Sequence, residues 1–139
     1  MKHWQFWALG SAGFAALTAI TGKIGVEDVD SNLATAIRTV VVVVFAFAIA
    51  GATGVLGQWR EINNRTWIFL VLSGLGTGAS WLCYYRALQL GPANRVAPLD
   101  KLSVVFVILL AAIFLKEPLT LRVLLGVGLI TSGALLLVK

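Results

Sequence analysis

Residues Trp81 to Leu137 read WLCYYRALQLGPANRVAPLDKLSVVFVILLAAIFLKEPLTLRVLLGVGLITSGALLL and indicate the class of fold more strongly than any other part of the chain. It contains two long apolar segments joined by a Lys-Glu-Pro turn at 116–118, with a Gly-Pro break before them and an Asp-Lys pair inside the first. Each segment has roughly the 20 residues that a helix needs to cross a bilayer core of about 30 Å. The stretch therefore predicts membrane-spanning helices rather than a soluble domain.

The composition of the whole chain supports this class. Of 139 residues, 59% are hydrophobic and only 12% are charged, whereas an ordinary soluble domain has about 25% charged residues. The mean hydropathy is +0.92 and the pI is near 9.9. The basic residues stand singly between apolar runs and form no basic face, so we expect membrane lipid as a partner and no nucleic acid.

Five apolar segments reach the length of a membrane span, near residues 4–22, 32–56, 67–90, 94–115 and 119–138. Tryptophans fall near the predicted ends, where indole rings favour the headgroup layer: Trp4, Trp7, Trp59 and Trp67. The sequence thus predicts an all-α integral membrane protein, with five transmembrane helices in a single domain over residues 1–139.

Local signals refine the second helix. The run Val40–Val44 would favour a strand in water, but in lipid a helix satisfies the backbone hydrogen bonds, and the run lacks the alternation of a barrel strand. Asp30 or Ser31 is the expected N-cap, since short polar side chains accept hydrogen bonds from the first turn.

The chain lacks the residue sets of common enzymes and metal sites. Cys83 is the only cysteine and His3 the only histidine, which excludes an intrachain disulfide, a cysteine zinc site and a Cys-His nucleophile pair. No phosphate-binding loop of the GxxxxGK[ST] type occurs. We therefore expect no enzyme activity, no cofactor and no metal.

Ionisable side chains inside predicted helices are the first candidates for function, because each costs about 2.5–3.5 kcal/mol on insertion scales: Arg38, Arg86, Asp100 and Lys101. They lie in the half of the membrane opposite the N-terminus, which predicts a polar vestibule. Lys101 and Arg38 could hold a carboxylate or phosphate group, and Asp100 could neutralise Lys101 or accept a coupling proton. The alternative is a purely structural ion-pair network between the second and fourth helices, with Arg86 reaching the headgroups.

Hydroxyl side chains recur on one face of the third predicted helix, at spacings of four, three and four: Ser73, Thr77, Ser80 and Tyr84. We expect this stripe to line a transport path. Alternatively, the hydroxyls only hold helices together, at about 0.6–2 kcal/mol each. A shorter stripe at Ser31, Thr35 and Arg38 on the second helix is expected to face it across a cavity.

Parts of the chain resemble a known family. The segments YYRALQLGPANRVAPLDKLS (84–103), FLKEPLT (114–120) and LLGVGLITSGALLL (124–137) are similar to the second half of a domain in the EamA branch of the drug/metabolite transporter superfamily. Residues 13–44 resemble its first two helices. Full-length members carry twice as many helices, in two inverted halves, so the chain looks like one half and resembles the small five-helix bacterial and archaeal subgroup.

The resemblance implies a secondary transporter in the inner membrane, most simply an exporter of a small polar or anionic metabolite such as an amino acid. A half-size chain invites a partner for alternating access. An antiparallel homodimer would recreate the inverted pair, and the nearly balanced Lys and Arg of the predicted loops leave insertion in both orientations open while favouring a cytoplasmic N-terminus. A parallel dimer or a different half-size subunit is equally open.

Two further functions remain open from the sequence. One is a non-transporting bundle subunit, for assembly or lipid handling, whose embedded charges are structural. The other is a proton-coupled exporter of lipophilic cations, which usually needs an acidic residue in the membrane. The glutamates lie in predicted loops, so Asp100 is the candidate for that role.

Overall fold

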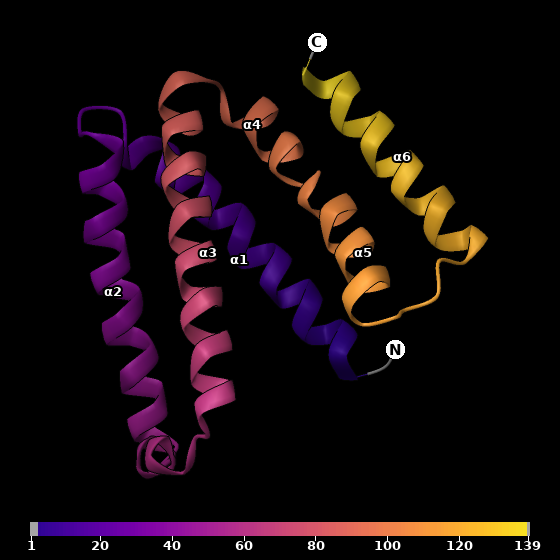
Figure 1. Ribbon diagram of the computed structural model, residues 1–139. Helices are drawn as coiled ribbons and strands as arrows, with labels where there is room; N and C mark the ends of the chain where they lie inside the picture. The colour runs from indigo at the N-terminus through magenta and orange to yellow at the C-terminus, as the bar shows by residue number, and fades with distance from the viewer. Residues whose placement is uncertain (1–2, 139) are drawn as a thin grey trace. The chain divides into compact units, whose positions relative to one another are not determined.

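The computed structural model of the protein describes residues 3–138, and its regular elements are all helical over that range (Figure 1). The elements are α1 His3–Gly25, α2 Ser31–Ala52, the 3-10 helix η1 Leu56–Glu61, α3 Asn64–Leu90, α4 Ala93–Asp100, α5 Ser103–Phe114 and α6 Leu121–Val138. They divide into two compact units, Gly22–Gln89 and the remainder of the chain.

Within residues 3–138, four helical stretches are long and apolar enough to cross a membrane: Ser31–Ala52, Asn64–Leu90, Ala93–Phe114 and Leu121–Val138. Their side chains are mostly exposed; the five valines at 40–44, for example, are 38–64% exposed and helical, as the sequence predicts. Apolar exposure on this scale is typical of helices whose solvent is lipid. The protein is thus a multi-pass membrane protein by fold, and a fifth span at α1 stays a prediction.

The ends of α2 follow from local backbone chemistry. Asp30 is its N-cap and accepts hydrogen bonds from the N–H groups of Asn32 and Leu33, as predicted. The helix ends at Ala52 and not near residue 56, because Gly54 adopts a positive φ of 72°. The Gly54 N–H then bonds to Gly51 O and the Val55 N–H to Ala50 O, which closes a Schellman motif.

Two turns after α2 were not expected from the sequence. Residues 56–61 wind into η1, which leads directly to α3. That helix begins at Asn64 rather than near residue 67, since the Asn63 side chain accepts a hydrogen bond of 2.8 Å from the Thr66 N–H. In Figure 1 α2 and α3 run antiparallel on either side of η1.

Buried residues of the unit Gly22–Gln89 concentrate where the α1–α2 loop meets the last turns of α3. Val26 and Leu88 are fully buried and Tyr85 is 4% exposed. Lys23 Nζ donates to Leu88 O at 2.8 Å, and Gln89 Nε2 donates to Val29 O at 3.0 Å. These bonds satisfy carbonyls at the end of one helix and in the neighbouring loop, which ties the two segments together.

In the other unit, the sequence predicts one helix over residues 94–115, and the structure has two helices there, α4 and α5. The segment Ala93–Phe114 is one apolar stretch but two helices, α4 with Pro98 inside it and α5, which meet at residues 101–102. The N–H groups of Lys101 and Leu102 bond three residues back, to Pro98 O and Leu99 O at 3.1 and 3.0 Å, so the turn tightens between α4 and α5. Helix α6 packs along α4 and touches α5 (Figure 1).

Candidate functional site

Arg38 presents the only stacked cation deep in a predicted span among the described residues 3–138. It lies about 10 Å along α2 from Ser31, at 1.5 Å per residue. Its guanidinium carbon is 4.0 Å from the ring centroid of Trp81 and 5.2 Å from that of Tyr85. Both distances are within the range of a cation–π interaction, so the charge is held by two aromatic rings of α3.

The part of α2 around Arg38 also carries three hydroxyl residues, Ser31, Thr35 and Thr39. Thr35 Oγ1 donates to Ser31 O at 2.8 Å, and both residues are buried. Thr39 Oγ1 donates to Thr35 O at 2.7 Å. The hydroxyls of Thr35 and Thr39 are therefore bonded within the helix, whereas no hydrogen-bond acceptor for the Arg38 guanidinium is found in the described part of the chain.

The aromatic wall on α3 is fixed from behind by a glycine. A Cβ on Gly22 would lie 3.0 Å from Tyr85 Oη, so the missing side chain makes the room that the phenol occupies. Tyr84 meets Tyr85 edge to face, with ring centroids 6.3 Å apart. Tyr85 is thus held in one position, with its ring near Arg38.

No carboxylate of the described residues forms a salt bridge with this guanidinium. Among residues 3–138, the one salt bridge joins Lys101 and Asp100, and no protein hydrogen-bond acceptor is found for Arg38. A guanidinium whose faces stack on rings keeps its N–H edge for a ligand, and that planar edge matches a carboxylate or phosphate. The cluster of Arg38, Trp81 and Tyr85, called the arginine cluster below, is therefore a candidate anion site.

The predicted hydroxyl stripe lies next to this cluster on α3 rather than in it. Ser73, Thr77 and Ser80 are exposed, and Thr77 Oγ1 donates to Ser73 O at 2.9 Å. Trp81 and Tyr85 each follow a stripe residue by one position, about 100° around the helix. These two aromatic residues were not among the predicted site residues, although their spacing of four residues places them on one face of a helix.

Lys101 and Asp100 form a separate pair at the break between α4 and α5. Lys101 Nζ lies 3.4 Å from Asp100 Oδ2, and the side chains are 58% and 36% exposed. Lys101 is also the C-cap of α4. Lys101 and Asp100, two of the predicted site residues, therefore pair with each other at the point where the helix is interrupted.

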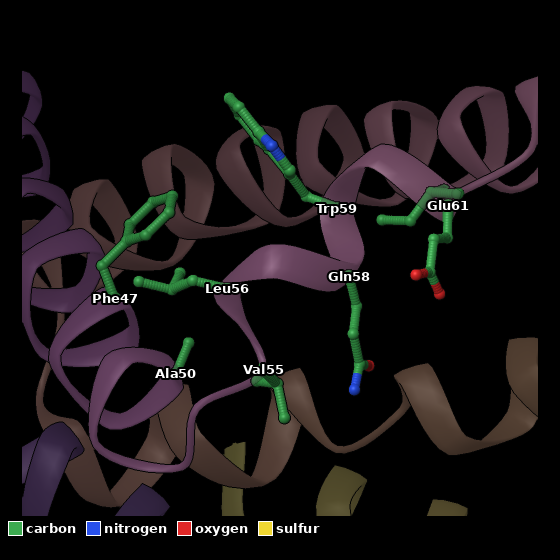
Figure 2. Close-up of a pocket in the computed structure, with 8 residues that line it drawn as sticks. Phe47, Ala50, Val55, Leu56, Gln58, Trp59 and Glu61 are labelled. Carbon is green, nitrogen blue, oxygen red and sulfur yellow. The ribbon is translucent and has the colours of Figure 1, made fainter.

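A third feature is a pocket of about 410 Å³ at the corner between the end of α2 and η1, shown in Figure 2. Two of the lining side chains, Gln58 and Glu61, are polar. The others are mostly apolar: Phe47, Ala50, Val55, Leu56, Trp59 and Ile62.

Among the described residues, no group of His, Cys, Asp and Glu is arranged to hold a metal ion.

The helices, their lipid-facing surfaces and the embedded cation define the class as a polytopic α-helical membrane protein. Within that class, the chain belongs to the EamA-like transporter family, which matches it over residues 2–139.

Two relatives agree with this family. A protein of Sinorhizobium sp named "Uncharacterized transporter in cobO 3'region" is 59% identical over 139 residues, covering 98% of this chain and 96% of its own. A protein of Hamiltonella defensa subsp. Acyrthosiphon pisum (strain 5AT) named "Probable 4-amino-4-deoxy-L-arabinose-phosphoundecaprenol flippase subunit ArnE" is 34% identical over 81 residues, covering 58% of this chain and 73% of its own. No solved structure matches the chain.

Proposed function

We propose that the protein is a secondary transporter, and not an enzyme, that exports a small polar or anionic metabolite such as an amino acid across the inner membrane. Membership of the EamA-like transporter family and the 59% identical relative named as a transporter support transport. The arginine cluster is the observation that supports an anionic solute. Its cation lies in a span and has no carboxylate partner among residues 3–138.

In this proposal, Arg38 holds the anionic group of the solute through its N–H edge. Trp81 and Tyr85 keep the guanidinium oriented, so that less conformational freedom is lost on binding. The path continues along the hydroxyl stripe of α3, Ser73, Thr77, Ser80 and Tyr84. Lys101 offers a second positive charge, and Asp100 neutralises it when no solute is bound.

We further propose that the chain forms one domain with five spans, α1 being the fifth, and works as half of an inverted repeat. Two copies would then alternate access around the sites of both, as one repeat moves against the other. Single cysteines placed at each terminus in a Cys83→Ser background test the antiparallel form, because both ends should then be labelled from outside intact cells. Labelling of one end only leaves a parallel dimer or a different partner subunit.

A second candidate function is favoured by the Hamiltonella relative, whose name makes it a subunit of a flippase for a lipid-linked phosphate sugar. A phosphate is a good ligand for a stacked guanidinium. In that function the arginine cluster would hold a lipid phosphate, and the chain would act with a second subunit. Export of lipophilic cations is less well supported, because Asp100 already pairs with Lys101.

Ligand-induced thermal stabilisation tests the choice. The purified protein is unfolded by heat in detergent with a panel of amino acids, dicarboxylates, sugar phosphates and a short isoprenyl phosphate. Stabilisation by a soluble carboxylate or phosphate supports the exporter of a metabolite, and stabilisation by the isoprenyl phosphate alone supports the flippase subunit. A panel without any effect on the unfolding temperature contradicts an anion site.

A further inference from the structure

The corner pocket between α2 and η1 is a second candidate binding site, well separated from the arginine cluster. Phe47, the first of its lining residues, lies about 13 Å along α2 from Arg38. The pocket volume of about 410 Å³ falls in the range of roughly 300–1,000 Å³ that small-molecule sites have. The pocket can therefore hold a ligand of its own.

The 3-10 geometry of η1 gives the pocket a polar side and an apolar side. Side chains three residues apart are eclipsed in such a helix, so Gln58 and Glu61 share one face while Leu56 and Trp59 share another. In Figure 2 Gln58 and Glu61 point to the same side of η1, and Leu56 reaches toward Phe47. A ligand in the pocket meets polar acceptors and apolar walls together.

The position of the pocket in the chain places it at the surface of the bilayer. The span Ser31–Ala52 ends just before it and the span Asn64–Leu90 begins just after it. The connecting residues 53–63 are far fewer than the roughly 20 needed to cross again. Trp59 is 60% exposed, and exposed indoles favour the headgroup layer. Lipid headgroups are thus the molecules that surround this pocket.

Glu61 decides the charge of the occupant. It is the sole charged residue in the lining, and among residues 3–138 it has no salt-bridge or hydrogen-bond partner. Because Glu61 is exposed, a cation that donates hydrogen bonds can reach its carboxylate and pair with it. The neighbouring Arg60 is exposed and can donate to an anion outside the pocket. The pair matches a zwitterion that carries an ammonium and a phosphate.

We propose that the corner pocket binds a phospholipid with a primary ammonium headgroup, of the phosphatidylethanolamine class. The ammonium donates to Glu61 and to the Gln58 side-chain oxygen, Arg60 donates to the phosphate, and Phe47 and Leu56 contact the glycerol and the first acyl carbons. A choline headgroup has no N–H to donate, so the pocket discriminates between the two lipids.

The test uses the full chain, stripped of lipid in detergent, and native mass spectrometry with lipids that share the same acyl chains. Phosphatidylethanolamine, its N-methyl and N,N-dimethyl derivatives and phosphatidylcholine form a series in which each methyl group removes one N–H donor. Binding should weaken along the series, by roughly tenfold between its ends, which is the loss expected for charge-assisted hydrogen bonds. Equal binding along the series overturns the proposal without any variant.

Variants then locate the site. Glu61→Gln should abolish the preference for phosphatidylethanolamine, whereas the control Glu117→Gln, in another loop and outside the pocket, should keep it. Strongest binding of phosphatidylglycerol, unchanged in Glu61→Gln, would also overturn the proposal, since it would show contact with basic residues alone. None of these outcomes depends on whether the protein transports an anion.

Discussion

Replacing Arg38 by leucine separates a ligand-binding arginine from a structural one. On insertion scales a charged residue at the centre of a span costs about 2.5–3.5 kcal/mol. Two cation–π contacts, at 4.0 and 5.2 Å from the ring centroids, return about 1–3 kcal/mol of that. Arg38→Leu removes both effects, so it should leave the free energy of unfolding unchanged or raise it by up to about 2 kcal/mol.

Heat unfolding followed by tryptophan fluorescence measures this change, with and without the anion that stabilises the wild type. The variant should remain folded and lose the response to the anion. Arg65→Leu is the matched control, since it removes another arginine that stacks on a ring, 6.0 Å above Phe69, and should keep the response. A loss of about 3–5 kcal/mol in the free energy of unfolding, the value for one partner removed from a buried charge network, would instead show that Arg38 is structural.

Three further changes test the fold. Gly22→Ala brings a methyl group to 3.0 Å from Tyr85 Oη and should cost about 1–3 kcal/mol in thermal unfolding, whereas Gly13→Ala, with nothing within 4 Å, should not weaken the protein. Asp30→Ala should cost about 0.5–2 kcal/mol through the lost N-cap of α2, with serine at that position restoring most of it. Pro98→Ala should raise the unfolding temperature, because it restores an N–H to the interrupted span, and should slow solute flux if the break is needed for motion; an unchanged unfolding temperature would show that the break has another cause.

The sequence was sufficient for the all-helical membrane class and several helix boundaries. The length of an apolar segment is a strong signal for a membrane-spanning helix. An unpaired backbone N–H or C=O group in lipid costs several kcal/mol, and a helix pairs these groups within the segment. The N-cap at Asp30 and the helical conformation of the valine run follow from the same local chemistry. The break near Lys101 was missed since Pro98 lies in a segment whose average hydropathy predicts an uninterrupted span.

Of the candidate site, the sequence predicted Arg38 but not the two aromatic rings beside it. Charge in an apolar segment is visible in the sequence, which is how Arg38 was found. Which ring of α3 meets the guanidinium depends on how α3 is rotated about its axis. Adjacent residues of a helix point about 100° apart, so a small error in this rotation selects different residues. The sequence therefore pointed to the hydroxyl stripe with Ser80 and Tyr84, while the structure places Trp81 and Tyr85 against Arg38.

Efflux from proteoliposomes measures whether the protein moves an anion that Arg38 holds. Liposomes loaded with the stabilising anion are prepared with wild-type protein, with Arg38→Leu and without protein, and the external anion is followed over time. We predict efflux from the wild-type liposomes alone. Equal efflux from the Arg38→Leu liposomes would contradict the role of this arginine, and wild-type efflux at the protein-free rate would contradict transport of that anion.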